Sequence, residues 1–330
     1  MHIDLSRRRF NVALASFAAC GVPTMSRAQA RVDIARIIVG YAPGGSADII
    51  SRKLAQRLSG AYARSVLVEN RPGAAGRLGV QAIKSLPADG SVMLITPASV
   101  LTLYPHIYKQ LGYDVFADLT PVAIVASFSF ALVVGPAVPA SVVTLDDFVK
   151  WCKASPAIAQ CANAGAGSLP HFLANLFARE TAIELTHVPY SGGLLALQAA
   201  AAGHVGAAIS NEASAVSLVQ AGKLRVLATT GKSHSIIFPH APTFNELGMT
   251  RVTQSEWFGV FMPAKVPSAV VATAANILVA ALREPDIRET WQKLGLGAEG
   301  STSAELQRAL RNEYDFWGPV IKGSGFTPES

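Results

Sequence analysis

The fold of this chain can be read from the stretch IIVGYAPGGSADII at residues 37–50. Its first part, Ile37–Tyr41, is rich in β-branched residues and is typical of a buried strand, and Ala42–Ser46 is a loop of small residues, Gly and Pro. Apolar residues then recur at helical spacing until Gly60, which stands where a helix commonly ends. We therefore predict a strand, a glycine loop and a helix, the repeating unit of a parallel sheet covered by helices.

The same unit recurs along the chain. Strands are expected at Val66–Val68, Val92–Ile95, Leu185–Val188, Val205–Ile209 and Leu224–Ala228, and helices at Leu145–Lys153, Ala213–Gln220, Ser268–Leu282 and Ala304–Ile321. Between them, Val122–Val125 and Ala131–Val134 are interpreted as two separate buried strands that bridge the halves of the protein. A chain of 330 residues with 50% hydrophobic composition can build two cores, so we expect two α/β lobes.

The segment 1–30 has the features of an export signal. Arg7–Arg9 precede an apolar run that ends at Cys20, and Ala28–Ala30 offers a cleavage site of small residues. Ser6–Phe10 matches the twin-arginine pattern, an address for export of folded proteins. We predict a periplasmic protein cleaved near Ala30. An ordinary secretory signal would lead to the same compartment, and lipid attachment at Cys20 is a less favoured alternative.

Charge and cysteine content narrow the classes of partner. The net charge of +6 falls to about +3 once the signal is removed, and no basic cluster is interleaved with aromatic residues. This excludes nucleic acid as an expected partner. After cleavage the remaining cysteines are Cys152 and Cys161, which could form a disulfide or remain as two buried thiols.

The chemically informative pattern is a glycine loop placed after a strand and before a helix, once in each lobe. Pro43–Ser46 and Ala164–Ser168 each supply backbone N–H groups and one hydroxyl. Such N–H groups, together with the positive end of the helix dipole, favour an anionic ligand. Each loop alone could also be a tight turn with a capping serine, but its recurrence in both lobes favours a ligand site.

Patterns typical of catalysis do not occur. Gly73–Gly79 reads G-x-x-G-x-x-G, which is not a dinucleotide fingerprint, and no P-loop is found. Ser46 and Ser168 do not complete G-x-S-x-G, and the histidines lack metal-ligand spacing. We predict a protein that is not an enzyme, with no catalytic residue, no metal site and no cofactor.

Three side chains near the loops allow two interpretations each. Asp48 could stabilise the helix dipole or accept a hydrogen bond from an amine or hydroxyl of the ligand. His171, in the first turn of its helix, could donate to a bound carboxylate or could simply lie at the surface. Tyr190 could offer a hydroxyl to the cleft or serve only in packing.

Taken together, these segments resemble the Bug family, the extracytoplasmic solute receptors of tripartite tricarboxylate transporters (TctC-like proteins). The resemblance covers the mature chain and rests on Tyr41–Asp48 with Arg52, Glu69–Gly76, Tyr113–Asp114 through Leu119–Val122, His187–Gly192, Leu224–Ala228, Pro242–Gly248 and Trp257–Gly259. It implies a two-lobed, type II-like periplasmic-binding-protein fold. Each lobe would be a mostly parallel sheet flanked by helices, with two crossovers forming a hinge.

The resemblance also implies a domain division and a binding site. Lobe 1 would comprise residues 31–128 and 257–330, and lobe 2 residues 129–256. A ligand carboxylate would be held between the glycine loops, partly through ordered water, by Tyr41, Gly44, Gly45, Ser46, Asp48, Ala164, Gly167, Ser168, His171, Tyr190 and Asn211. Family members often carry Pro and Thr where this chain has Ala42 and Ala47. The contacts to the rest of the ligand are therefore left open.

The resemblance implies a monomeric receptor that captures a small organic acid or amino acid and hands it to membrane permease subunits. Two alternatives belong to other classes. The loaded protein could dock on a signalling ectodomain as a ligand sensor, or the chain could be an exported enzyme, since twin-arginine export often carries folded cofactor proteins.

Overall fold

The computed structural model describes residues 32–298 and 300–324, which belong to one compact unit. The expected export signal at residues 1–30 lies outside the described residues. Within the described ranges, no helix is both long enough and apolar enough to cross a membrane. The expected lobe limits at 128/129 and 256/257 stay a prediction.

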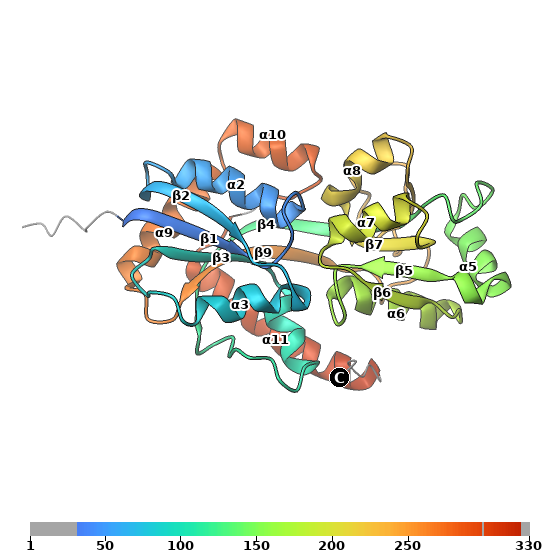
Figure 1. Cartoon of the computed structure of the whole chain (residues 1–330), viewed down its shortest axis with the longest axis horizontal. Helices are drawn as coiled ribbons and strands as arrows, with labels where there is room; N and C mark the ends of the chain where they lie inside the picture. Colours follow the sequence, from blue (N-terminus) through green and yellow to red (C-terminus); the bar gives the residue numbers. More distant parts are fainter. Residues whose placement is uncertain (1–31, 299, 325–330) are drawn as a thin grey trace, which may run out of the picture. The chain divides into compact units, whose positions relative to one another are not determined.

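The strands form one continuous sheet in the order β2-β1-β3-β9-β4-β7-β5-β6, with β8 also paired to β4. Their bounds are β1 (Val32–Val39), β2 (Ala63–Asn70), β3 (Val92–Pro97), β4 (Leu119–Val134), β5 (Gln160–Asn163), β6 (Thr186–Pro189), β7 (Ala207–Asn211), β8 (Arg225–Thr229) and β9 (Ser255–Pro263). In Figure 1, β4 and β9 lie between the strands β1–β3 and the strands β5–β7.

Two strand groups can be defined by these pairings. The first group contains β1, β2 and β3, which are mutually parallel, and residues 119–129 of β4, with β9 antiparallel to β3 and β4. The second group contains β5, β6, β7 and β8, with residues 130–134 of β4 antiparallel to β7 and β8. Each group is thus mostly parallel with one reversed strand, because its strands come from repeated strand-helix units.

Helices follow most strands, as the periodicity predicts. The α-helices are α2 (Ser46–Leu58), α3 (Arg77–Ile83), α4 (Ser99–Thr102), α5 (Leu145–Ala154), α6 (Leu169–Thr181), α7 (Gly193–Ala201), α8 (Glu212–Gln220), α9 (Ser268–Ala281), α10 (Pro285–Lys293) and α11 (Ser303–Ser324). Short 3-10 turns lie at Ala74–Gly76, Tyr104–His106 and Pro156–Ile158. The helices after β9 pack on the first strand group: α9 contacts α2 and β4, and α11 contacts α4 and β4.

The expectation of two strands between Val122 and Val134 is wrong, because residues Leu119–Val134 form the single strand β4. Apolar residues continue through the middle of this segment at Ala126, Phe128 and Phe130, alternating with serines as in a strand that is half buried. The strand ends only at Gly135. As a result, one strand passes from the first group into the second, and β9 returns beside it.

Helix α10 was not expected from the sequence. Its buried side chains are Ile287 and Trp291, four positions apart on one face, and Pro285 occupies its first turn. The indole Nε1 of Trp291 donates to the carbonyl of Val125, at 3.0 Å, which ties this helix to β4.

The glycine motif at residues 73–79 serves close backbone packing. A Cβ on Gly40 would lie 2.5 Å from the carbonyl oxygen of Gly76, and one on Gly79 would lie 2.7 Å from Cα of Gly40. The loop before α3 can therefore lie directly on the end of β1 only because these positions lack side chains. Cys152 and Cys161 are both buried and do not form a disulfide. Of the two possibilities left open by the sequence, the structure therefore has two buried thiols.

Candidate functional site

A cavity of about 630 Å³, part of it open to solvent, lies where the two strand groups meet. Its described lining comes from both groups: Tyr41, Ala42, Gly45, Ser46, Ala47, Pro97, Ser99, Phe128, Phe130, Ala164, Ser168, Pro170, Gly192, Gly193, Leu194, Leu195, Ser210, Asn211, Ser214, Glu256 and Phe258. Helices α2, α6, α7 and α8 all begin at this lining. A cavity lined by both strand groups and by four helix starts is the candidate ligand site.

Two of these helices begin without a side-chain cap. The N-cap residue is Gly45 at α2 and Gly192 at α7. Neither glycine has a side chain, and no side-chain capping hydrogen bond is formed at either helix start. The first N–H groups of any helix lack partners inside the helix. Since Gly45 and Gly192 both line the cavity, the free amide ends and positive dipole ends of α2 and α7 lie at its wall.

The other two helix starts are satisfied by their own side chains. Ser168 Oγ accepts from the backbone N–H of His171 at the start of α6, and Asn211 Oδ1 accepts from the N–H of Ser214 at the start of α8. The serine of the second glycine loop therefore acts as a helix cap, the alternative that the sequence left open.

The two strand groups touch directly across the cavity. Ser46 Oγ lies 2.8 Å from Oδ1 of Asn211 and 2.8 Å from Oγ of Ser214. A Cβ on Gly44 would lie 3.3 Å from Cδ2 of Leu194, so the first glycine loop also lies close to the start of α7. These contacts hold α2 against α7 and α8.

Asp48 supports the first glycine loop and does not line the cavity. Its carboxylate accepts from the N–H of Gly44 at 3.0 Å, from Nε of Arg52 at 2.9 Å and from Nδ2 of Asn70 at 3.0 Å. Burial alone would raise the pKa of Asp48, but these hydrogen bonds together hold its pKa below the ordinary value. The carboxylate is thus fully engaged in fixing the loop.

The second glycine loop packs on the first strand group. A Cβ on Gly165 would lie 2.6 Å from Cβ of Ala75, and the hydroxyl of Tyr108 donates to the carbonyl of Ala166. Gly167, whose φ is +72°, donates through its N–H to Nδ1 of His171. This loop therefore meets the turn at residues 74–76, while the first glycine loop meets α7.

His171 and Tyr190 lie away from the described cavity lining. The ring of His171 stacks on that of His187, with centroids 3.4 Å apart, and burial with the neighbouring His187 lowers the pKa of His171 to about 3. It is therefore neutral. Tyr190 is half buried and packs in the smaller hydrophobic cluster, and its N–H donates to the carbonyl of Asn163.

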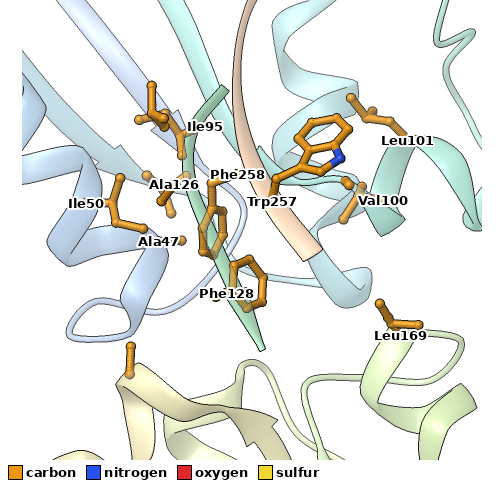
Figure 2. Packing of buried hydrophobic residues seen from close by; sticks show 14 of the residues in the cluster. Ala47, Ile50, Ile95, Val100, Leu101, Ala126, Phe128, Leu169, Trp257 and Phe258 are labelled. Atoms are coloured by element: carbon orange, nitrogen blue, oxygen red, sulfur yellow. The ribbon is translucent and has the colours of Figure 1, made fainter. Parts of the chain in front are cut away.

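Aromatic rings from the crossing strands form the apolar part of the lining. Phe128 of β4 stacks on Phe258 of β9 with centroids 4.6 Å apart, and Phe130 meets Phe128 edge-on at 5.3 Å. Figure 2 shows the rings of Phe128 and Phe258 next to each other, beside the start of α2 that carries Ala47. No local pattern in the sequence marks these residues, because their place depends on how two distant strands pair.

One carboxyl group also lines the cavity. Glu256, at the start of β9, is 5% exposed and accepts at Oε1 from the backbone N–H of Ser99, at 2.7 Å. Burial raises the pKa of Glu256 to about 7; hydrogen bonds from Ser99 oppose this rise, and the charge of Glu313 adds to it. This residue was not singled out from the sequence, where it is a lone Glu in no motif.

The structure brings part of the predicted site together. The cavity lining includes Tyr41, Gly45, Ser46, Ala164, Ser168 and Asn211, and does not include Gly44, Asp48, Gly167, His171 or Tyr190. The hydroxyl of Tyr41 donates to the carbonyl of Ala75, so this side chain also connects two loops. The segment Gly192–Gly193 also supplies a helix start to the cavity wall.

Comparison with known proteins identifies the fold and the relatives. The family described as tripartite tricarboxylate transporter family receptor matches residues 50–326. Protein BugT of Bordetella pertussis is 30% identical over 291 residues, which cover 88% of this chain and 89% of the relative. An R. palustris protein solved with adipate superposes with a TM-score of 0.85 at 28% identity, over 94% of this chain and 100% of that chain.

A further solved structure bears on the fold alone. The periplasmic binding protein BugD superposes with a TM-score of 0.83 at 23% identity, over 89% of this chain and 98% of that chain. The predicted two-lobed periplasmic-binding-protein fold is confirmed, and the strands β4 and β9 are its two crossovers.

Proposed function

Because the chain belongs to the family of tripartite tricarboxylate transporter receptors, we propose that it is a periplasmic receptor for a small carboxylate. The ligand is captured in the cavity between the lobes and delivered to the permease subunits of such a transporter. The loaded receptor acts as a monomer.

One observation supports this proposal most strongly, namely the two uncapped helix starts at one cavity wall. Helices α2 and α7 come from different lobes, and each offers backbone N–H groups and a positive dipole end. A carboxylate can accept from both helices at once, and its charge compensates both dipoles. A carboxylate bound in this way would stabilise the state in which the two lobes lie close together, because only in that state can both helices contact it.

The relatives agree with this choice of ligand. The R. palustris protein was solved with adipate, which is a carboxylate. In the described cavity lining of this chain, Ser46 is engaged by Asn211 and Ser214, and Ser168 by the start of α6. Neither Asn211 nor Ser214 is a general base that could activate Ser46, which supports capture without turnover.

The proposal can be tested by isothermal titration calorimetry on the purified mature protein. Malate, adipate and benzoate would be titrated alongside their uncharged amides. We expect at least one carboxylate to bind and its amide not to bind, because only the carboxylate compensates the helix dipoles.

Delivery is tested separately. Permease subunits in membranes should retain the receptor more strongly when it carries ligand. Absence of binding by every carboxylate tested would disprove carboxylate capture. Ligand-dependent retention by a signalling ectodomain and not by the permease would leave capture intact and replace the partner.

A further inference from the structure

The described lining of the cavity carries no positively charged side chain, although the proposed ligand is an acid. Among its described lining residues there is no Lys, Arg or His, and the only acidic residue is Glu256. A carboxylate at the starts of α2 and α7 can be held by N–H groups alone. A second carboxylate on the same ligand would find no cationic side chain in the described lining.

Glu256 lies on the side of the cavity that faces α4 and α11. It and Ser99 also line a neighbouring cavity that is partly open to solvent, whose other described lining residues include Thr102, Glu313 and Trp317. No residue of α2 or α7 belongs to the described lining of that second cavity. Glu256 therefore lies where the ligand cavity adjoins this second cavity, which the starts of α2 and α7 do not line.

Much of the remaining cavity lining is apolar. Phe128 and Phe258 form a stacked pair at the cavity, and Phe130 extends this surface. Pro97 and Leu194 add further apolar contacts from β3 and α7. A hydrocarbon chain or ring would be buried favourably here, whereas a polar ligand body would lose water without gaining partners.

Resting on the proposed function, we propose that this receptor selects monocarboxylates that have an apolar body and a hydrogen-bond donor at the far end, with Glu256 as the acceptor for that donor. The Glu256 carboxyl is fixed by the N–H of Ser99 and retains further acceptor positions, since a carboxylate can accept about four hydrogen bonds. A dicarboxylate of the same length would instead place a second negative charge against Glu256.

Calorimetry with matched acids tests this selection in the wild-type protein. An aromatic series is benzoate, para-hydroxybenzoate and terephthalate, and an aliphatic series is hexanoate, ω-hydroxyhexanoate and adipate. In whichever series binds, we expect the hydroxy acid to bind about tenfold more tightly than its parent, as a charge-assisted hydrogen bond provides. The dicarboxylate should bind at least about tenfold more weakly than the hydroxy acid.

The variant Glu256→Gln assigns the effect to this residue. The amide keeps an oxygen for the N–H of Ser99 but removes the charge and adds a donor. The ratio of dissociation constants of dicarboxylate and hydroxy acid should therefore fall by about tenfold or more. Glu289→Gln makes the same change on the exposed face of α10, where Glu289 pairs with Lys293, and should leave the ratio unchanged.

The outcomes separate this inference from the proposed function. Tighter binding of a dicarboxylate than of the hydroxy acid by the wild-type protein overturns the inference and leaves carboxylate capture standing. An unchanged ratio in folded Glu256→Gln protein also overturns it. If that variant does not fold, the wild-type series decides alone. Failure of every acid in both series removes the inference together with the proposed function.

Discussion

The hydroxyl of Ser46 lies 2.8 Å from Oδ1 of Asn211, although 165 positions separate the two residues in the sequence. Ser46 is the first residue of α2, and Asn211 is the N-cap of α8, so this hydrogen bond joins the starts of helices from the two lobes. The same hydroxyl lies 2.8 Å from Oγ of Ser214. A side chain at the ligand cavity therefore helps to hold the two lobes together.

Removal of this bridge should weaken ligand binding. In Ser46→Ala the contacts to Asn211 and Ser214 are lost, while the backbone N–H groups of α2 remain. We expect carboxylate affinity to fall by about fivefold to twentyfold, since hydrogen bonds of this kind contribute about 1 kcal/mol or somewhat more. Small-angle X-ray scattering of the unliganded variant should show a larger radius of gyration than the wild-type protein.

The control is Ser85→Ala, which removes an exposed hydroxyl that bonds only locally, to the carbonyl of Ala82. Affinity and scattering equal to wild type are expected for it. Equal values for Ser46→Ala as well would mean that the bridge does not contribute to closure.

A capping carboxylate built into the chain should compete with the ligand. Gly45 has φ −80° and ψ 171°, and a Cβ there would have its nearest neighbour, the carbonyl oxygen of Ala42, at 3.8 Å. In Gly45→Asp the new side chain can therefore cap α2 without strain. We expect carboxylate affinity to fall at least about tenfold in calorimetry, with a thermal unfolding temperature equal to or above that of wild type.

Gly45→Ala separates charge from size at the same position. It adds the Cβ and leaves the N–H groups of α2 free, so carboxylate affinity should stay near the wild-type value. Unimpaired binding by Gly45→Asp would show that the ligand carboxylate is not held at the start of α2.

The affinity for a dicarboxylate should depend on pH through Glu256. The titratable groups around it are Glu313 from α11, Tyr41 and Tyr104, and burial raises the pKa of both tyrosines so far that they stay neutral. As pH rises through about 7, Glu256 gains its charge and repels a second carboxylate. The dissociation constant of terephthalate relative to benzoate should therefore increase between about pH 6 and pH 8.

Benzoate serves as the internal reference because it has no second charge. In Glu256→Gln the ratio should no longer change with pH beyond the contribution of Glu313, whose pKa burial also raises to about 7. A ratio that stays constant with pH in the wild-type protein would contradict a charged Glu256 at the ligand.

A second buried carboxyl predicts a pH-dependent stability. Glu212, at the start of α8, accepts a hydrogen bond from Ser235. Burial, opposed by that bond, raises the pKa of Glu212 from its ordinary value of 4.5 to about 7. Between these values the folded protein retains a proton that the unfolded chain has lost. The free energy of unfolding therefore falls as pH rises from about 4.5 to about 7.

The substitution Glu212→Gln should abolish this decrease in the free energy of unfolding, because a glutamine does not ionise. The variant should match wild type near pH 4 and exceed its free energy of unfolding by up to about 3 kcal/mol near pH 8, as measured by urea denaturation. The exposed Glu184 provides the matched control, since Glu184→Gln should show no such difference between the two pH values. Equal effects of Glu212→Gln at both pH values would refute the raised pKa.

The strand-helix units could be predicted from the sequence because their signals are local. The strand Ile37–Tyr41 was expected at the position of β1, and the expected helix Leu145–Lys153 differs from α5 by one residue at its end. Local periodicity could not reveal that β4 is one strand, because Ser127 and Ser129 interrupt the apolar run, although both fall on one face of a strand.

Part of the candidate site was predictable, from the glycine loops and from the resemblance to a known family. Gly45 and Ser46 line the cavity as expected, whereas Asp48 faces Arg52 and Asn70, a choice that depends on tertiary contacts. Phe258 and Glu256 were missed because the pairing of β9 with β4 decides which of their side chains reach the cavity. Pairing between strands so far apart leaves no local pattern in the sequence.

The alternation of β4 has a consequence for how relatives of this chain can diverge in evolution. Phe128 and Phe130 both reach the cavity because they are two positions apart on one face of the strand. Inserting or deleting a single residue before them would turn both rings to the opposite face. Exchanging the side chains at these two positions therefore alters the cavity wall without disturbing the strand, whereas a one-residue change in length just before them would remove both rings from it.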